Sequence, residues 1–440
     1  MTARSATAFA GPASARAANS SAGADSLIYG TSWGGGGGTV EITYSFPDFG
    51  SSWPRPYGDF DEPRAGFQPL SASQEAAVRE ALELWAGVAD IRFVEVVESG
   101  SDVGDLRFAR TSASPSAHAY LPQSGPPSGD VWLGPSFLPG MDYAPGSYGF
   151  FVMVHEIGHA LGLKHPHEPG GIGGVLEAGA DWIGSTVMSY RSLAGDRLGK
   201  LYSNDLFPKT PMALDIAAIQ ELYGANGTTG AGNTVYAWAS GERVFETIYD
   251  TGGIDTIDWS NQSSSALIDL RPGAWSELGA PVRARGGKSP DTLALADGTL
   301  IENALGGSGN DKIWGNDLDN LLDGGSGKDR LWGLGGDDIL VAGPGKDRLD
   351  GGDGLDVAVF AGDSADFKIS VKKNGKITVI DKETGDGDLG KNKLFAIEIL
   401  EFDDVLLEAG PGKTLVPLGS GQAVAAAGLD SLVNDGQTVV

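Results

Sequence analysis

The stretch that decides the fold of the first half of the chain is His155-Glu156-Ile157-Gly158-His159-Ala160-Leu161-Gly162-Leu163-Lys164-His165. Residues four apart on a helix project from the same face, so His155 and His159 are placed to bind one metal ion. Gly162 can adopt the positive φ that ends a helix and turns the chain back. That turn would bring His165 in as a third nitrogen ligand.

The residue after the first histidine has a different role. Glu156 is displaced by one position, which places its carboxylate beside the ion, where a general base for water must stand. Three protein ligands leave a fourth position open, as in catalytic rather than structural zinc sites. The chain has 5 His, and three fall at these spacings, so an accidental cluster of histidines is the weaker interpretation. The stretch predicts a catalytic zinc site.

The pattern His-Glu-x-x-His-x-x-Gly-x-x-His resembles that of the metzincin metalloproteases, which carry a methionine turn downstream. Thr186-Val187-Met188-Ser189-Tyr190 fits that turn. The resemblance implies that Met188 forms an apolar floor under the zinc without binding it. It also implies that Tyr190 is the tyrosine that in the serralysin and astacin branches binds zinc and swings to stabilise the oxyanion. Taken alone, Met188 would be ordinary core packing and Tyr190 a buried, locally hydrogen-bonded tyrosine.

Composition limits the class of protein. With 440 residues, two or more domains are expected. The net charge of −27 argues against nucleic acid and anionic membranes as partners. An excess of Asp among 68 Gly instead indicates hard cations such as calcium. The absence of cysteine excludes disulfides and thiol redox chemistry, and no apolar stretch reaches the length of a membrane helix.

The first half predicts an α+β domain over residues 26–240. Residues 1–25 are rich in Ala and Ser and are expected to be disordered; in serralysin-like enzymes the equivalent region is a propeptide, and a plain terminus is the alternative. Residues 34–38 are five glycines that predict a flexible joint. A strand at 40–46, a helix from Ser71 or Ser73 to Gly87, and strands near 91–97, 105–109, 117–121 and 130–133 precede the zinc helix. By resemblance, one of the last two strands is the edge that pairs with an extended substrate.

Two segments flank the methionine turn. The glycine-rich loop 166–185 is shorter than in typical serralysins, and its His167 is either a fourth ligand or a solvated loop histidine. The helix expected at 211–224, with Pro near its start and Gly at its end, carries Asp215-Ile216-Ala217-Ala218-Ile219-Gln220. This run closely resembles the helix that closes the serralysin protease domain.

The second half is governed by a nine-residue repeat. From Gly306 the chain reads GGSGNDKIW, GNDLDNLLD, GGSGKDRLW, GLGGDDILV, AGPGKDRLD and GGDGLDVAV, which matches the calcium-binding β-roll pattern of RTX proteins. Glycines make the tight turns, the sixth residue supplies a calcium ligand and the eighth fills the roll. The sixth residues are Asp311, Asn320, Asp329, Asp338, Asp347 and Asp356, and the eighth are Ile313, Leu322, Leu331, Leu340, Leu349 and Ala358.

Three further residues are expected to bind calcium. Glu302 lies one period before the first repeat in the same phase, and Asp255 and Asp258 lie in a segment that resembles the start of the roll in serralysins. A turn with solvated Asp residues is the alternative for the latter pair. Asn320 is neutral and its repeat has a single leading glycine, so calcium is expected to bind more weakly there.

Together these features predict an α+β metzincin zinc-protease domain followed by an all-β parallel β-roll domain. We expect the roll over 241–360, a β-rich module over 361–410 with a hairpin at Asn374-Gly375, and a tail over 411–440 whose end only loosely matches an export signal. The resemblance implies a secreted, monomeric zinc endopeptidase acting on proteins and peptides. It further implies type I export machinery and a small protein inhibitor as partners. The alternatives are a calcium-dependent RTX surface or binding protein with an inactive zinc domain, and a narrow processing protease or toxin.

Overall fold

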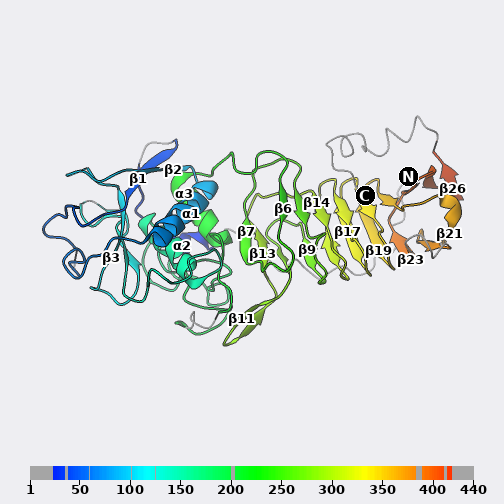
Figure 1. The fold of residues 1–440 in the computed structure, drawn as a ribbon. Helices are drawn as coiled ribbons and strands as arrows, with labels where there is room; N and C mark the ends of the chain where they lie inside the picture. Colours follow the sequence, from blue (N-terminus) through cyan, green and yellow to red (C-terminus); the bar gives the residue numbers. More distant parts are fainter. Residues whose placement is uncertain are drawn as a thin grey trace.

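The computed structural model describes residues 23–34, 38–58, 60–100, 102–123, 125–199, 204–382, 389–410 and 414–418. The expectations for a propeptide before residue 23, for the glycines at 35–37 and for an export signal after residue 418 lie outside these ranges. Helices gather at one end of the molecule, and a ladder of short strands extends from them to the other end (Figure 1).

The helical end combines a five-stranded sheet with three helices. The sheet has the order β2-β1-β3-β5-β4, and only β4, at the edge, runs antiparallel to its neighbour. Ser71 caps the first helix and forms a capping box with Gln74. The elements are β1 Val40–Ser45, α1 Ala72–Val88, β2 Ile91–Glu95, β3 Leu106–Arg110, β4 His118–Ala119, β5 Val131–Leu133, α2 Tyr148–Ala160 and α3 Ala213–Tyr223.

The chain is ordered slightly earlier than predicted. The 3-10 helix η1 (Ala24–Leu27) is largely buried and accepts hydrogen bonds from the segment after the zinc-site helix, with Lys164 N to Leu27 O at 2.6 Å and Gly173 N to Asp25 O at 3.0 Å. Residues 24 and 25 therefore form part of the folded domain rather than a disordered terminus.

The second half is a parallel β-roll made of two facing sheets. Within the nine-residue repeats, strands alternate between the sheets, so each pairs with the strand 18 residues on, as in Leu321↔Ile339 and Arg330↔Arg348. The strands of one sheet are β6 Val235–Ala237, β8 Thr256–Asp258, β14 Asn303–Leu305, β16 Leu321–Asp323, β18 Ile339–Val341, β20 Val357–Val359, β24 Ile399–Phe402, β25 Val405–Gly410 and β26 Thr414–Pro417. Those of the other are β9 Leu267–Asp269, β15 Lys312–Trp314, β17 Arg330–Gly335, β19 Arg348–Asp353, β23 Lys391–Phe395, β22 Ile377–Asp381 and β21 Phe367–Val371.

The interior of the roll confirms the assigned phase of the repeat. The six eighth-position side chains, Ile313, Leu322, Leu331, Leu340, Leu349 and Ala358, are all 0% exposed. Beyond the roll, β21 and β22 pair antiparallel around Asn374-Gly375, which confirms the predicted hairpin. Near it lies the short 3-10 helix η3 (Ser364–Asp366).

The two hydrophobic cores do not divide at residue 240. Phe245 and Trp275 belong to the core of the helical domain, where their rings lie 6.3 Å and 5.9 Å from that of Trp182. They come from a connecting region that carries two small sheets. Its strands are β7 Glu246–Ile248, β10 Trp275–Ser276, β11 Val282–Ala284, β12 Gly287–Ser289 and β13 Leu293–Leu295.

Candidate active site

Helix α2 carries the first two histidines and the glutamate. Ser147 begins it by accepting a hydrogen bond from Phe150 N at 3.2 Å. Gly158 lies against Met188, and a Cβ there would be 2.7 Å from the Met188 sulfur. The helix therefore needs a glycine at this position so that the methionine turn can lie directly beneath it.

The turn after α2 delivers the third histidine. Gly162 has φ +112°, and a Cβ there would lie 2.2 Å from the carbonyl oxygen of Thr31. Leu163 N donates back to Gly158 O at 2.9 Å, closing the helix end. The chain then reverses and places His165 beside His155 and His159, as the motif predicts.

The three imidazoles converge through their Nε2 atoms. His165 Nε2 lies 3.2 Å from His155 Nε2 and 3.0 Å from His159 Nε2. Each Nδ1 faces an oxygen that only accepts hydrogen bonds: Val187 O at 2.7 Å, Leu163 O at 2.8 Å and Glu168 Oε1 at 2.8 Å. Each Nδ1 must therefore carry the proton, which leaves three Nε2 lone pairs facing one another.

This donor set fits a metal cation. Burial, reinforced by neighbouring imidazoles, lowers the pKa of His155 well below its usual range and that of His165 to about 2. Burial likewise lowers the pKa of His159. Three neutral imidazoles with converging lone pairs repel one another unless a cation lies between them, and imidazole nitrogen is a preferred zinc ligand.

Glu156 lies beside these nitrogens in the same hollow. Its side chain is buried, and Oε2 has no hydrogen-bond partner among the residues the structure describes. Burial raises the pKa of this carboxyl to about 8. The hollow has a volume of about 240 Å³ and is lined by residues that include Glu156, His159, His165, His118 and Tyr190.

The methionine turn is anchored by a buried carboxylate. Asp215 of α3 accepts hydrogen bonds from Thr186 Oγ1 at 2.5 Å, Val187 N at 2.7 Å and Met212 N at 2.8 Å. Met188 is fully buried. Tyr190 is 36% exposed, and its ring centroid lies 4.3 Å from that of His165, so its phenol is within reach of the histidine cluster.

Several residues at this site were not predicted from the sequence. Glu168 binds His165, and at the cleft edge His118 Nε2 lies 2.8 Å from Glu62 Oε1, which also accepts a hydrogen bond from Tyr120 at 2.6 Å. Glu62 lies in a loop far from the motif in sequence, so no spacing signals it. The structure places His167 outside the Nε2 cluster, in a second group with His165 and Glu168.

Comparisons with known proteins agree with this geometry. The Matrixin family profile matches residues 68–173, and the profile described as Peptidase M10 serralysin C terminal matches 213–396. The chain is 34% identical over 311 residues to Metalloprotease AprA of Pseudomonas entomophila (strain L48), which covers 65% of this chain and 61% of that protein. It is 35% identical over 309 residues to Serralysin C of Dickeya chrysanthemi, covering 64% and 60%. In both halves the chain resembles serralysin-type metalloproteases.

The matched regions cover only part of these relatives. The chain spans only about three fifths of the length of these curated relatives, at 61% and 60%. The Matrixin match implies zinc at the histidine triad. Among the described residues, no helix is long and apolar enough to cross a membrane.

In the β-roll the sixth-position carboxylates form two buried ladders. Asp329 Oδ1 accepts from Asp311 N at 2.8 Å and Asp338 Oδ1 from Asn320 N at 2.8 Å, and the pattern repeats one coil further on with Asp347 and Asp356. The second oxygens of Asp329, Asp338, Asp347 and Asp356 are buried without a hydrogen-bond partner among the described residues. Burial raises the pKa of each, to about 8 for the first two and about 7 for the others.

The remaining predicted calcium ligands differ from this pattern. Both oxygens of Asp311 accept backbone N–H groups. The amide of Asn320 donates to Glu302 O at 3.0 Å and to Asn316 Oδ1 at 3.1 Å, so it is fully hydrogen-bonded without an ion. The carboxyl of Glu302 accepts from Asp255 N at 2.8 Å.

Asp258 does not lie with the other predicted calcium ligands. It lies at an outward position of β8 and accepts a hydrogen bond from Ser260 N at 2.9 Å. Asp250, which the repeat phase did not signal, is buried near Asp255. Burial raises the pKa of Asp255, and the charges of Asp250 and Glu302 raise it further.

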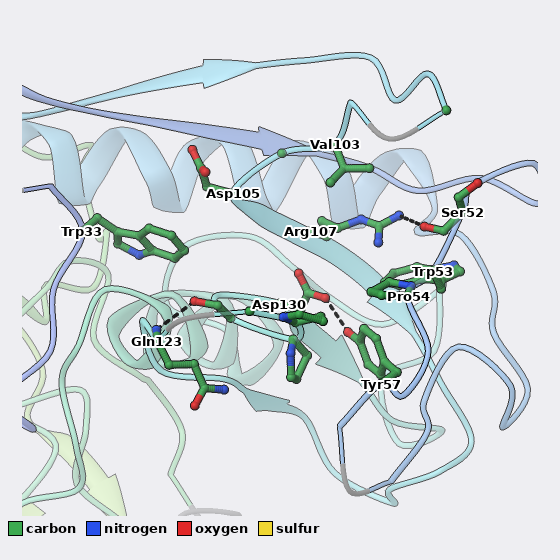
Figure 2. Close-up of a pocket in the computed structure, with 16 residues that line it drawn as sticks. Trp33, Ser52, Trp53, Pro54, Tyr57, Val103, Asp105, Arg107, Gln123 and Asp130 are labelled. Carbon is green, nitrogen blue, oxygen red and sulfur yellow. Dashed lines mark hydrogen bonds between the residues drawn. The ribbon is translucent and has the colours of Figure 1, made fainter.

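A second cavity of about 680 Å³ lies in the helical domain, lined by Trp33, Trp53, Tyr57, Arg107 and Asp130 among others. Figure 2 shows the Asp130 carboxyl between Arg107 and Tyr57, with the Tyr57 hydroxyl donating to it. Burial raises the pKa of Asp130 to about 8. None of the three cluster histidines lines this cavity, so it is separate from the candidate active site.

Proposed function

We propose that this serralysin-type chain is a secreted zinc endopeptidase that hydrolyses peptide bonds of extracellular proteins. The observation that carries the proposal is the convergence of three Nε2 lone pairs beside a buried glutamate whose Oε2 has no partner among the described residues. Catalytic zinc sites have three protein ligands and an adjacent acid–base residue.

His155, His159 and His165 would hold the ion through Nε2. Zinc bound there would lower the pKa of a water at its open position and polarise the peptide carbonyl. The oxygens that accept from each Nδ1 fix the tautomer and the ring orientation, which keeps the ligands positioned before substrate arrives.

Glu156 acts as the general base. Its buried carboxyl has a pKa of about 8 in the absence of any cation, and a neighbouring dication favours the ionised form. The carboxylate then takes a proton from the attacking water and returns it to the leaving amine. Because the side chain is enclosed, this proton is held in the cleft rather than lost to solvent.

Tyr190 and β4 contribute to substrate binding. The Tyr190 phenol donates a hydrogen bond to the oxygen that becomes negatively charged as water adds to the carbonyl. Strand β4 is the edge of its sheet and runs along the hollow at His118 and Ala119, so an extended substrate can pair with it. Met188 supports the site from below without touching the reaction.

Calcium binding would complete the second domain. The oxygens of Asp329, Asp338, Asp347 and Asp356 that have no partner among the described residues are the strongest candidates, with Asp311, Asp255 and Glu302 as further ligands and Asn320 the weakest position. Neither carboxylate ladder exists in an unfolded chain, so calcium binding is coupled to folding. We infer passage through type I export machinery before folding outside the cell, monomeric protein as the active form, and inhibition by a small protein that fills the cleft.

The decisive experiment compares casein hydrolysis by the wild-type protein and by Glu156→Gln at equal zinc content. We expect a loss of at least about a thousandfold in kcat/KM, since the base is removed while the ligands remain. The control is Glu177→Gln, which removes one exposed carboxylate from the neighbouring loop. Equal rates in wild type and Glu156→Gln would remove this residue from the mechanism. Inactivity of zinc-loaded wild type on casein and on a peptide library would favour a calcium-dependent binding protein.

A further inference from the structure

The cavity around Asp130 lies on the side of the five-stranded sheet that faces away from the helices. Arg107 lines this cavity, whereas its neighbours on β3, Leu106 and Phe108, belong to the core that the helices share. In the same way, Asp130 lines the cavity and Val131 belongs to that core. Successive residues of a strand face opposite sides of a sheet. The sheet would therefore separate a ligand in this cavity from helix α2 and its histidines.

The walls of the cavity are largely apolar. Trp33, Trp53 and Tyr57 line it, together with three prolines. Trp132 supports two of these rings, since its ring centroid lies 5.0 Å from that of Trp53 and 6.0 Å from that of Tyr57. Rings that are packed in this way offer a rigid apolar surface to a ligand, and their faces attract cations.

Asp130 presents a buried carboxyl group to this cavity, with only 4% of the residue exposed. Its Oδ2 accepts a hydrogen bond from the hydroxyl of Tyr57, which in turn accepts one from Trp132 Nε1 at 3.0 Å. Figure 2 shows the other oxygen pointing away from Tyr57. That oxygen, Oδ1, accepts no hydrogen bond from any residue within the described ranges. A buried oxygen of this kind favours a donor supplied by a ligand.

Arg107 does not supply the missing positive charge. Its Nε and Nη2 donate to the two carboxylate oxygens of Glu98 at 2.8 Å and 2.7 Å, and its guanidinium lies 3.5 Å from the centre of the Trp53 ring. Glu98 therefore matches the charge of Arg107. The other two charged residues that line the cavity, Asp105 and Asp130, are both acids. The cavity thus has an excess of negative charge when Asp130 is ionised.

The groups around Asp130 set the pH at which its carboxyl ionises. Burial raises its pKa to about 8, the Tyr57 hydrogen bond and the charge of Arg107 act to lower it, and the charges of Glu98 and Glu62 act to raise it. A cation placed against the free oxygen would favour the ionised form. Binding of a cation should therefore release a proton below pH 8, and it should strengthen as the pH rises through about 8.

We propose that this cavity binds a small organic cation, whose charged head pairs with Asp130 and whose apolar stem lies against the aromatic rings. An anion is disfavoured by the two acids. A metal ion is disfavoured because it needs several ligand atoms, and the clusters that could hold one in the described part of the chain all include His165. A neutral ligand would leave the excess negative charge unmatched.

The proposal is tested by isothermal titration calorimetry on the full chain with zinc and calcium bound. The probes are n-butylguanidinium, which stays charged between pH 6 and pH 9, and n-butylurea, a neutral molecule of the same shape. We expect wild type at pH 9 to bind the cation at least about tenfold more tightly than the urea. Between pH 9 and pH 6 the affinity for the cation should fall at least about tenfold.

Asp130→Asn should remove both differences, because asparagine does not ionise. The control Glu83→Gln removes one exposed carboxylate from helix α1 and should keep both. A second variant changes the charge of the cavity without altering Asp130. Val103 lines the cavity and is 36% exposed, so Val103→Lys should weaken binding of the cation and leave that of the urea unchanged. Zinc content and the circular dichroism spectrum should match wild type in every variant.

N-acetylarginine amide distinguishes two sources of the cation. Binding at least as tight as that of n-butylguanidinium would assign the cavity to an arginine side chain of a protein, and weaker binding would assign it to a free small molecule. Equal binding of n-butylguanidinium and n-butylurea by wild type would overturn the proposal. Unchanged binding of the cation in Asp130→Asn, or an affinity that is the same at pH 6 and pH 9, would also overturn it.

Discussion

At the scale of single residues, the histidine triad depends on the acceptors behind each ring. Two of these acceptors are backbone carbonyls, of Val187 and Leu163, and the third is the carboxylate of Glu168. A carboxylate behind an imidazole increases its basicity as a ligand and fixes its orientation. Glu168 is therefore the one acceptor that can be changed by mutation without altering the backbone.

We predict that Glu168→Gln weakens zinc binding by roughly tenfold, because the neutral amide still accepts from His165 Nδ1 but no longer polarises the ring. Competition with a fluorescent chelator measures the zinc affinity directly. Glu177→Gln, with an exposed side chain in the same loop, should leave it unchanged. An affinity of the Glu168 variant within twofold of wild type would show that orientation alone, and not charge, matters behind His165.

The sequence predicted the ligands but not their supports, for a physical reason. The positions of His155, Glu156 and His159 follow from helical periodicity, which is local, and Gly162 signals the turn to His165. Their supports, such as Asp215 beneath the methionine turn and Glu62 beside His118, are brought in by tertiary packing between segments far apart in the chain. Asp258 was misplaced because a strand alternates its faces, and the ninth position faces outward.

At the scale of elements, a buried acid directly precedes strand β5. Asp130 has a pKa raised to about 8 by burial, while an unfolded Asp titrates near pH 4. Between these values the unfolded chain loses a proton that the folded chain keeps. Its contribution to stability is therefore full below pH 4 and is lost as pH rises through about 8.

We predict that wild type loses stability relative to Asp130→Asn as pH rises from 5 to 8, by on the order of a few kcal/mol. Asparagine keeps an acceptor for the Tyr57 hydroxyl but does not titrate. Urea unfolding of the helical domain at saturating zinc and calcium measures the difference at each pH. A constant difference across this range would mean that Asp130 is already ionised in the folded protein.

In the roll, the second repeat is a natural test of the calcium assignment. The Asn320 amide uses its N–H groups within the protein, whereas the aspartates one coil further along each ladder, Asp329 and Asp338, leave an oxygen unpartnered among the described residues. We predict that Asn320→Asp binds one more calcium ion than wild type, as counted by native mass spectrometry. Asn310→Asp adds the same charge at an exposed position and should add none. An unchanged count in Asn320→Asp would show that this turn lacks the carbonyl cage its neighbours share.

At the scale of the whole molecule, the two-part architecture could be predicted from the sequence. The zinc motif marks the first part, and the nine-residue repeat continues over many residues of the second. The boundary between the cores was not predictable in the same way. Phe245 and Trp275 lie in sequence on the roll side but pack into the helical domain against Trp182. Contacts of this kind leave no periodic trace, and they tie the zinc domain physically to the region that carries the two small sheets.

We propose that one zinc ion, held by three imidazoles of this chain, carries the proteolytic activity. This proposal is tested most directly by stripping all metal, restoring calcium alone, and then titrating zinc while recording bound zinc, X-ray absorption at the zinc edge and casein hydrolysis. We predict that calcium restores the strand signal without hydrolysis, and that hydrolysis rises in step with one bound zinc, with three nitrogen ligands at about 2.0 Å. His165→Ala should lose both zinc and activity. Hydrolysis by the zinc-free protein, or one bound zinc without imidazole ligands, would contradict the account.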